Sequence, residues 1–292
     1  MKAAIFGKNF NDNFKSSLNK FFDILKENKV ELMIYEPYFR FISENCSFVP
    51  DIYTLYNEPF TDDLPDLVFS IGGDGTFLDT VSYVKDKEIP IAGINSGRLG
   101  FLANISKDDI PKALKAIFEN RFTLENRTLL EVNTDKKYFS EFNFALNEVT
   151  VLKRDSGSMI TINVFVNGEF LNTYWADGLI LSTPTGSTAY SLSLGGPIVV
   201  PGSSNFIITP VAPHNLTVRP IVLPDNCDIT IKVTGRAENY LLSIDSRSVV
   251  AEKNTEICVK AASFKIKTVR IEGNSFFNNI RDKLMWGFDK RN

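Results

Sequence analysis

In the first part of the chain, short apolar runs typical of strands alternate with segments whose apolar positions repeat at helical spacing. Short apolar runs typical of strands occupy residues 3–6, 30–35, 67–71 and 89–94. Residues 11–29 instead repeat their apolar positions at helical spacing, which predicts a helix with one buried face. That face consists of Phe14, Leu18, Phe21, Phe22 and Leu25. Strands that alternate with helices predict an α/β domain over the first 125 residues, with a doubly wound, Rossmann-like parallel sheet that binds ligands at the carboxyl ends of its strands.

The same part of the chain contains one further helix signal and one segment without a clear pattern. Ser106 and Asp109 have the spacing of a helix cap, and they precede a helical segment at residues 110–118. Pro111 stands near the start of this segment, where proline is tolerated. Residues 37–65 are irregular and rich in aromatic side chains, and no element is predicted for them.

From residue 126 onward the pattern changes to that of short strands. Residues 158–166, 256–260 and 264–269 alternate apolar and polar side chains, as strands with one buried face do. The pair Asn167-Gly168 is a strong hairpin signal. Residues 126–270 are therefore predicted to form a β-rich second domain.

The end of the chain returns to helical periodicity. Residues 275–285 place large apolar side chains at helical spacing, and such a stripe on a terminal helix favours packing over a functional role. These side chains are Phe276, Phe277, Ile280 and Leu284.

Length and composition limit the classes to which this chain can belong. Its 292 residues are enough for two domains, and 43% hydrophobic with 23% charged residues is ordinary for a globular protein. No apolar run approaches the roughly 18 residues of a membrane span, and a net charge of −3 gives no basis for nucleic-acid binding. The N-terminus resembles a strand more than a signal peptide. Cys46, Cys227 and Cys258 lie far apart and are expected to be reduced thiols of a cytoplasmic protein.

The single histidine, His214, restricts the chemistry further. Ser-His-Asp or Cys-His catalysis would have to use this residue, and a site with several histidine ligands is excluded. It lies in an apolar, proline-rich loop at residues 210–214, which favours a structural or ligand-contacting role over that of a general base. Phosphoryl transfer needs no histidine.

A glycine-rich turn, Gly72-Gly73-Asp74-Gly75-Thr76, follows the apolar run at residues 67–71 and precedes a helix-like segment that extends to Lys85. Strand, glycine turn and helix together form a common phosphate site, because glycine lets the backbone approach an anion and the helix N-terminus offers free N–H groups. A carboxylate at this place repels phosphate, unless it holds a metal or accepts a proton from an attacking hydroxyl. The turn thus indicates a kinase, and an ordinary turn that closes a strand is the alternative.

A second segment, residues 177–197, gathers hydroxyl groups, glycines and one tyrosine. Ser and Thr hydroxyls donate and accept hydrogen bonds, and Tyr190 offers a ring face with a polar tip, a combination that suits a nucleoside. Together with the glycine turn, residues 93–102 and the pair Asn147-Glu148, this segment closely resembles the NAD kinase family in order and spacing, from residue 66 to 220. The glycine turn alone also resembles diacylglycerol kinases, sphingosine kinases and phosphofructokinases.

The resemblance implies an enzyme that uses ATP to phosphorylate NAD at the 2′-hydroxyl of the adenosine ribose, which makes NADP. Asp74 would be the catalytic base, and an alternative is that it only orients the sugar hydroxyls. The ATP phosphates would be held by Gly72, Gly73, Gly75 and Thr76. Mg²⁺ is expected to arrive with ATP, because no cluster of carboxylates marks a dedicated metal site. The tail at residues 271–292 would return to the first domain.

The NAD site that the resemblance implies draws on both parts of the chain. Asn147 would read an adenine edge and Glu148 would hold ribose hydroxyls, whereas the pair alone would be taken for a strand end and a turn. Asp177 would contact the nicotinamide side. Further contacts would come from Asp74, Gly75, Phe101, Thr185, Thr188, Ala189, Tyr190, Ser191, Leu192 and Ser193.

Three candidate residues depart from those common in the family. Trp175 stands where a basic residue is common, Ser158 where histidine is common, and Arg247 where an amide is common. Trp175 can stack on a ring, and Arg247 can hold a phosphate or a neighbouring carboxylate, so all three stay among the NAD-binding candidates. The choice between NAD⁺ and NADH, and between ATP and polyphosphate as donor, is left open. Asp79 and Arg98 are expected to be solvated or structural.

Two other functions are open on the residues alone. A lipid kinase shares the glycine turn but needs an apolar cleft in place of the hydroxyl-rich segment. A regulator that binds NADP(H) without turnover would keep the pocket, although a pure binder has no need for the Asp74 carboxylate.

The resemblance also implies a homo-oligomer. In NAD kinases the loop that matches residues 210–214 reaches into the pocket of a neighbouring subunit. Ala212 and His214 would therefore complete the site of a partner subunit in a tetramer or a dimer. A β-rich domain with exposed strand faces gives a symmetric assembly a surface to bury.

Overall fold

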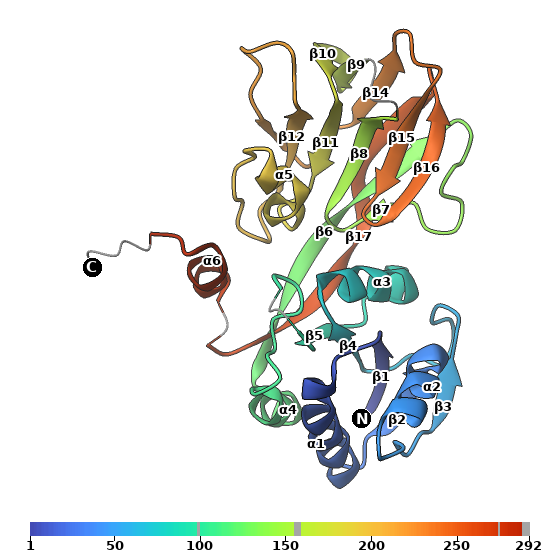
Figure 1. Cartoon of the computed structure of the whole chain (residues 1–292), viewed down its shortest axis with the longest axis vertical. Coiled ribbons are helices and arrows are strands. Elements are labelled where there is room, and N and C mark those ends of the chain that lie inside the picture. Colours follow the sequence, from blue (N-terminus) through green and yellow to red (C-terminus); the bar gives the residue numbers. More distant parts are fainter. Residues whose placement is uncertain (98–99, 155–158, 274, 288–292) are drawn as a thin grey trace. The chain divides into compact units, whose positions relative to one another are not determined.

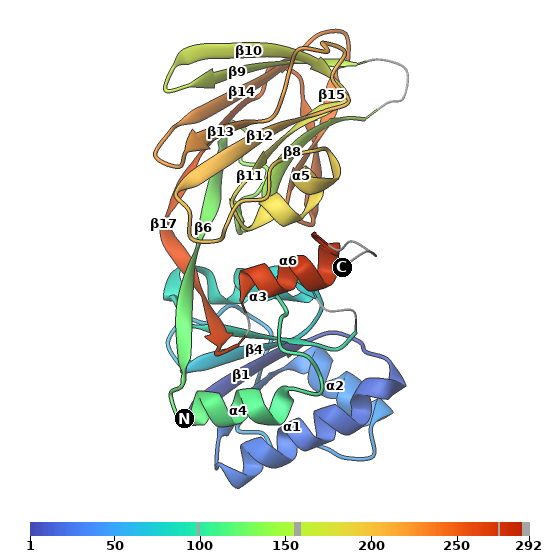
Figure 2. The same cartoon turned by 90° about the vertical axis from the view of Figure 1, so that its left-hand side faces the viewer.

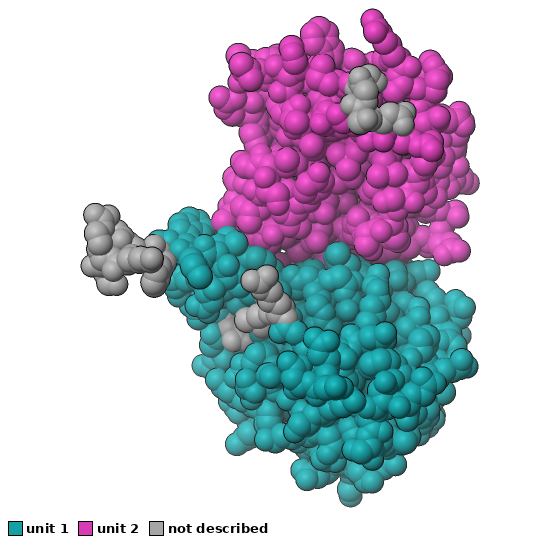
Figure 3. Space-filling view, viewed as in Figure 1, with its two compact units in different colours: residues 1–126, 266–292 teal, residues 127–265 magenta. Residues whose placement is uncertain are grey.

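The computed structural model describes residues 1–97, 100–154, 159–273 and 275–287. The chain divides into two compact units (Figure 1 and Figure 3). Unit 1 comprises residues 1–126 and 266–292, and unit 2 comprises residues 127–265. The predicted divisions followed residues 125 and 270.

Unit 1 is built on a parallel sheet. Its strands are β1 (Lys2–Gly7), β2 (Glu31–Tyr35), β3 (Thr54–Tyr56), β4 (Leu67–Gly72), β5 (Ile91–Asn95) and the last part of β17 (Glu256–Ile271). They lie in the order β3-β2-β1-β4-β5-β17 and pair in parallel. Every residue of β4 and β5 is buried, which explains why these strands read as continuous apolar runs. The predicted α/β class is confirmed.

Helices cover both faces of this sheet. They are α1 (Lys15–Glu27), α2 (Glu36–Asn45), α3 (Asp74–Val84) and α4 (Ile110–Phe118). The terminal helix α6 (Phe276–Leu284) and short 3₁₀ turns at Asp12–Phe14 and Lys85–Lys87 also belong to unit 1. Buried residues of α1, α2 and α4 join those of the strands in one apolar core. The α3 helix lies on the opposite face of the sheet (Figure 2).

The α2 helix lies in the stretch for which no element was predicted. Pro37 occupies its first turn, where a missing N–H is tolerated, and Tyr38 and Ile42, one turn apart, are buried. Phe39 and Phe41 are also partly buried against the same core. The helix is only ten residues long, and its apolar side chains fall between Tyr38 and Ile42, so the segment contains too few turns for the repeat that periodicity detects.

Unit 2 consists of antiparallel strands in two sheets around one core. The strands are β6 (Phe122–Thr134), β7 (Phe144–Ala145), β8 (Glu148–Lys153), β9 (Ile160–Val166), β10 (Glu169–Ala176), β11 (Gly178–Ser182), β12 (Asn205–Val211), β13 (Ile221–Pro224), β14 (Ile229–Thr234), β15 (Asn239–Ile244) and β16 (Arg247–Glu252). One sheet has the order β13-β12-β11-β8-β15-β16, and β10-β9-β14-β17 form the other. Buried residues of both sheets pack together, and the predicted β-rich domain is confirmed.

Two local predictions had different outcomes. Asn167, with a φ of 52°, and Gly168, with a φ of 81°, form the predicted hairpin turn between β9 and β10. Residues 256–260 and 264–269 are extended as predicted, but they belong to one continuous strand, β17, in place of two short ones. The small residues Ala261-Ala262-Ser263 weaken the alternation in the sequence without ending the extended backbone.

No helix in the described part of the chain is long and apolar enough to cross a membrane. Cys46, Cys227 and Cys258 are all free thiols. Only Cys258 is exposed, and Cys227 is buried.

Candidate functional site

The glycine-rich turn joins β4 to α3 at the carboxyl end of a central strand. Gly73 caps the N-terminus of α3 in an extended conformation, and Asp74 is the first helical residue. A Cβ at Gly72 would lie 2.6 Å from the Cβ of Thr76, so this glycine is required by packing. A Cβ at Gly73 or Gly75 would meet no atom within 4 Å. The backbone there is open to a ligand beside the free N–H groups of a helix N-terminus.

The Asp74 carboxylate accepts hydrogen bonds from three consecutive backbone N–H groups. Oδ2 accepts from Phe101 at 2.7 Å, and Oδ1 accepts from Leu102 and Ala103 at 2.9 Å each. Gly100 lies so close that a Cβ there would be 2.6 Å from Oδ2 and nearer still to Oδ1. Because charged acceptors form strong hydrogen bonds, this loop fixes the orientation of the carboxylate.

Phe101, predicted as an apolar wall, lies against the terminal helix α6. Its ring centroid is 6.3 Å from that of Phe276, and the Nζ atom of Lys283 lies over its ring, 4.4 Å from the centroid. This Nζ atom is buried and has no hydrogen-bond partner among the described residues. Burial lowers the pKa of Lys283 to about 8, and the carboxylates of Asp74 and Asp282 act in the opposite direction. Sequence reasoning missed Lys283, since its spacing is that of any polar residue on a tail helix.

Asp79 and Arg98 were expected to be solvated or structural. Asp79 lies on α3 and forms an ion pair with Lys8. Arg98 lies outside the described residues.

In unit 2, the pair Asn147-Glu148 lies at the start of β8. The Asp245 carboxylate accepts hydrogen bonds from the N–H groups of Leu146 at 2.8 Å, Asn147 at 2.8 Å and Glu148 at 3.1 Å. The Thr183 N–H donates to the Asn147 carbonyl at 2.9 Å, and its hydroxyl donates to the Leu146 carbonyl at 2.6 Å. Asp245 and Thr183 thus hold the backbone of the pair, a role that sequence reasoning did not assign to either residue.

The side chain of Glu148 is in an unusual state. Its Oε2 atom is buried and has no hydrogen-bond partner in the described part of the protein. Burial raises the pKa of Glu148 to about 8, the charge of Asp245 acts in the same direction, and a backbone hydrogen bond from Tyr190 opposes both. A buried acid with a shifted pKa and an unused oxygen is typical of a ligand site.

The hydroxyl-rich segment follows β11 as a 3₁₀ turn (Gly186–Thr188) and the short helix α5 (Tyr190–Ser193). Gly186 packs on the backbone of Asn147, since a Cβ there would lie 2.6 Å from the Asn147 carbonyl carbon. The segment and the Asn-Glu pair, which are separate in the sequence, are therefore in direct contact within unit 2.

The hydroxyls of this segment differ in their surroundings. Thr185 is buried, and its Oγ1 accepts a hydrogen bond from Arg127 at 3.4 Å. The Thr188 hydroxyl donates to the Thr185 carbonyl at 3.2 Å, and Ser191 is buried with its hydroxyl 2.8 Å from that of Thr209. The more accessible predicted residues are Thr188, Ala189, Tyr190, Leu192 and Ser193.

The residues predicted at the nicotinamide end and at the subunit interface lie near the ends of β10 and β12. The His214 N–H donates to the Trp175 carbonyl at 2.8 Å, and Asp177 forms an ion pair with Lys153 at 2.6 Å. Trp175 is 57% exposed, and Ala212 is exposed with a φ of 43°.

Arg247 was predicted to hold a phosphate or a neighbouring carboxylate. Its guanidinium lies over the Phe142 ring, 5.0 Å from the centroid, and donates to the carbonyls of Phe142 and Phe144. Its charge also acts on Asp245, where burial raises the pKa and Arg247 lowers it. Ser158 lies outside the described residues.

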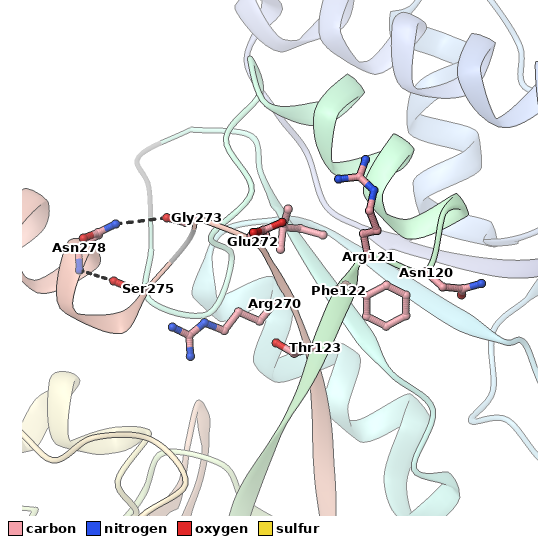
Figure 4. Close-up of a pocket in the computed structure, with 10 residues that line it drawn as sticks. Asn120, Arg121, Phe122, Thr123, Arg270, Glu272, Gly273, Ser275 and Asn278 are labelled. Carbon is pink, nitrogen blue, oxygen red and sulfur yellow. Dashed lines mark hydrogen bonds between the residues drawn. The ribbon is translucent and has the colours of Figure 1, made fainter.

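The described part of the chain contains no candidate metal cluster, and one cavity of unit 1 lies apart from the predicted residues. No group of three or more His, Cys, Asp or Glu side chains there could hold a metal ion. A cavity of about 700 Å³ in unit 1 lies between the start of β6, the end of β17 and the start of α6 (Figure 4). Its lining includes Arg121, Phe122, Arg270 and Asn278 but no predicted site residue.

Unit 1 combines a doubly wound sheet with an open glycine turn at the carboxyl end of a strand and a fixed carboxylate in that turn. Unit 2 adds a hydroxyl-rich segment. These features together define a nucleotide-binding phosphotransferase. Two family models match the chain: the ATP-NAD kinase N-terminal domain over residues 13–122 and the ATP-NAD kinase C-terminal domain over residues 146–271. The chain belongs to the NAD kinase family.

Relatives and solved structures agree with this assignment. NAD kinases of Cytophaga hutchinsonii and Flavobacterium johnsoniae are 41% and 44% identical, and both match over 100% of each chain. Yeast NADH kinase, solved with NADH, has a TM-score of 0.88 at 27% identity and covers 99% of this chain and 88% of its own. An Archaeoglobus fulgidus NAD kinase, solved with ATP, has a TM-score of 0.75 at 27% identity, with 98% and 99% covered.

Proposed function

We propose that this chain transfers the γ-phosphoryl group of ATP to the 2′-hydroxyl of the adenosine ribose of NAD. A bond forms between the 2′-oxygen and the γ-phosphorus, the bond from that phosphorus to the β–γ bridging oxygen breaks, and ADP leaves. The Asp74 carboxylate accepts the hydroxyl proton as general base. Relatives named NAD kinase that match the whole chain support this activity, and the ATP complex of a structural neighbour supports ATP as the donor.

The observation that carries the proposal is the environment of Asp74. Three backbone N–H groups occupy most of the roughly four lone-pair positions of a carboxylate and hold it in one orientation. Such a group needs no reorganisation when the reactive hydroxyl arrives, which is the property of an efficient catalytic group. The open backbone at Gly73 and Gly75 leaves room for phosphate beside it.

Each unit supplies one part of the binding work in this proposal. In unit 1, Gly72, Gly73, Gly75 and Thr76 hold the ATP phosphates at the N-terminus of α3. In unit 2, Asn147 and Glu148 bind adenine and ribose, with the hydroxyl-rich segment beside them. The raised pKa of Glu148 lets its carboxyl donate a hydrogen bond near neutral pH as well as accept one.

Mg²⁺ fits this site as an ion that ATP brings with it. The described residues offer no cluster of three ligands, and the Asp74 oxygens are mostly occupied by N–H donors. This donor set suits an ion held mainly by phosphate oxygens and water. When bound, the ion neutralises charge on the β and γ oxygens.

The test of the base is Asp74→Asn, with Asp79→Asn as the matched control on the same helix. General-base catalysis contributes about 10²- to 10⁴-fold, so we expect Asp74→Asn to lower kcat by that order while NAD affinity changes much less. Asp79→Asn should leave kcat unchanged, because Asp79 pairs with Lys8 at the surface. A loss of NAD affinity with kcat preserved would make Asp74 a binding residue only.

The alternative functions lose their support in the comparisons. The family models and the relatives are those of NAD kinases over the full chain, and none of those reported is a lipid kinase. An assay of the purified protein with Mg-ATP and NAD⁺ for NADP⁺ separates the remaining possibilities. NAD binding without product would favour the non-catalytic regulator.

We further propose that the active form is a homotetramer or a dimer whose sites are completed by Ala212 and His214 of a partner subunit. Ala212 holds a left-handed backbone with a φ of 43°, a strained conformation that is concentrated at functional sites. Trp175 and Leu216 are 57% and 84% exposed, so this end of unit 2 offers an apolar surface to bury.

Light scattering measures the assembly, and subunit complementation tests whether the site is shared. Two inactive variants, Asp74→Asn and Ala212→Glu, are co-expressed, because a mixed oligomer then contains some sites with both wild-type residues. We expect part of the activity to return. A monomer with full specific activity, or an oligomer of the two variants without any recovery, contradicts the shared site.

A further inference from the structure

The ammonium of Lys283 is held in a way that stability does not explain. Its Nζ atom is buried without a hydrogen-bond partner among the described residues. An ammonium carries three donors, and leaving a charged donor buried and unpaired is costly. The Phe101 ring, 4.4 Å away, offers a cation–π contact but accepts no conventional hydrogen bond.

The position of Lys283 beside Asp74 indicates what those donors are for. The carboxylate of Asp74 is close enough to act on the pKa of Lys283, yet the Lys283 Nζ atom forms no hydrogen bond to it or to any other described residue. Asp74 instead uses its oxygens for backbone N–H groups. The ammonium therefore stays unpaired next to the glycine turn.

The turn itself lacks a cation. Residues 72–84, which form the glycine turn and α3, contain no lysine or arginine. A triphosphate in this turn would meet the negative charge of Asp74, and phosphoryl transfer sites offset such charge with a lysine or arginine as well as a metal ion. A buried lysine on a separate element can supply that charge at a fixed point.

We propose that Lys283 is a phosphate-binding residue of this enzyme, whose ammonium donates hydrogen bonds to the triphosphate of ATP beside Asp74. The inference rests on the proposed function, because it takes the glycine turn as the ATP phosphate site. On this view the terminal helix α6 is part of the active site of unit 1, and Phe101 is the platform that holds the ammonium in place.

A purely structural lysine is the alternative, and it makes a different prediction. If Lys283 only packs α6 against Phe101, its replacement lowers stability and affects both substrates to a similar degree. If it binds the triphosphate, its replacement acts on ATP and leaves NAD nearly unaffected.

The experiment compares Lys283→Met, which keeps the length and removes the charge, with Lys283→Arg and with Arg281→Met. Arg281 is exposed on the same helix and contacts Asn278, so it controls for loss of one positive charge. Initial rates are measured with Mg-ATP varied at saturating NAD, and with NAD varied at saturating Mg-ATP. Mg-ATP affinity is measured separately by calorimetry without NAD.

We expect Lys283→Met to lower kcat/KM for Mg-ATP about 10- to 100-fold, the effect of losing one hydrogen bond from a charged donor. KM for NAD should change by less than about threefold, and Lys283→Arg should restore part of the loss. Arg281→Met should match the wild type. Unchanged kinetics for Mg-ATP in Lys283→Met, or equal losses for both substrates, overturn the proposal.

Failure of this inference is distinguishable from failure of the proposed function. Loss of kcat in Asp74→Asn together with normal Mg-ATP kinetics in Lys283→Met would reject the role of Lys283 and leave the proposed function standing. Normal kcat in Asp74→Asn together with impaired Mg-ATP kinetics in Lys283→Met would reject Asp74 as the base and support Lys283 as a phosphate contact. Where Lys283→Met does not fold, Lys283→Gln provides the comparison, because it removes the charge and keeps a shorter polar side chain with N–H donors.

Discussion

Replacement of Gly100 by alanine tests whether the loop after β5 sets the position of the Asp74 carboxylate. The new Cβ would lie 2.6 Å from Oδ2, whereas atoms in normal contact lie about 3.5–4.0 Å apart. Oδ1 lies nearer still, so the carboxylate must move by at least about 1 Å, which weakens its bonds to Phe101, Leu102 and Ala103. A misplacement of about 1 Å can cost about 10²-fold in rate, so we expect a fall in kcat of that order.

The stability of the protein should fall as well. Hydrogen bonds to a charged group contribute about 1.5–3 kcal/mol each, so disruption of one or two lowers the free energy of unfolding by roughly 2–5 kcal/mol. Steady-state kinetics and urea unfolding measure the two effects. Gly97→Ala is the matched control, because Gly97 is exposed in the same loop and a Cβ there meets no atom within 4 Å.

A double-mutant cycle decides whether the effect acts through Asp74. If it does, Gly100→Ala lowers kcat much less in the Asp74→Asn background than in the wild type, because the base is already gone. Independent, multiplicative losses would refute the reasoning, as would a Gly100→Ala variant with the kcat of Gly97→Ala.

Two further predictions concern unit 2. Burial raises the pKa of Glu148 to about 8 in the folded state, from an ordinary value of 4.5. Between these two pH values the folded state holds a proton that the unfolded state has released. The free energy of unfolding therefore falls as pH rises through this range, by at most about 1.4 kcal/mol per pH unit. Glu148→Gln should therefore gain stability relative to the wild type from pH 6 to pH 8 in urea unfolding, and parallel pH profiles would show that Glu148 does not titrate in this way. Gly186→Ala places a Cβ 2.6 Å from the Asn147 carbonyl carbon, so we expect the free energy of unfolding to fall by about 1–3 kcal/mol and NAD binding to weaken. An unchanged urea midpoint would show that the backbone moves apart without a cost in stability.

Much of the fold follows from local patterns in the sequence. The apolar runs of β1, β2, β4 and β5, the stripe of α1 and the Asn167-Gly168 turn each depend on residues within a few positions of one another. Periodicity detects such elements because a strand or a helix repeats its buried face at a fixed interval. It failed at α2, a ten-residue helix with few repeats of its buried face, and within β17, where small residues broke the alternation.

The motif residues were also predictable, but the groups that orient them were not. Asp74 was singled out by its place in the glycine turn and Asn147 and Glu148 only by the resemblance to the family, whereas Asp245 and Lys283 resemble ordinary polar residues in the sequence. The structure gives Asp245 three backbone donors around the Asn-Glu pair, and it brings Lys283 from the terminal helix to the ring beside Asp74.

The sequence by itself determined most of the elements, the reaction class and the acid in the glycine turn. Tertiary structure alone decided which carboxylates are held by backbone N–H groups, which acid is buried with a raised pKa, and which lysine lies unpaired beside the turn. The physical reason is that hydrogen bonding, burial and charge depend on distances between atoms, and packing brings together residues whose separation along the chain carries no periodic signal.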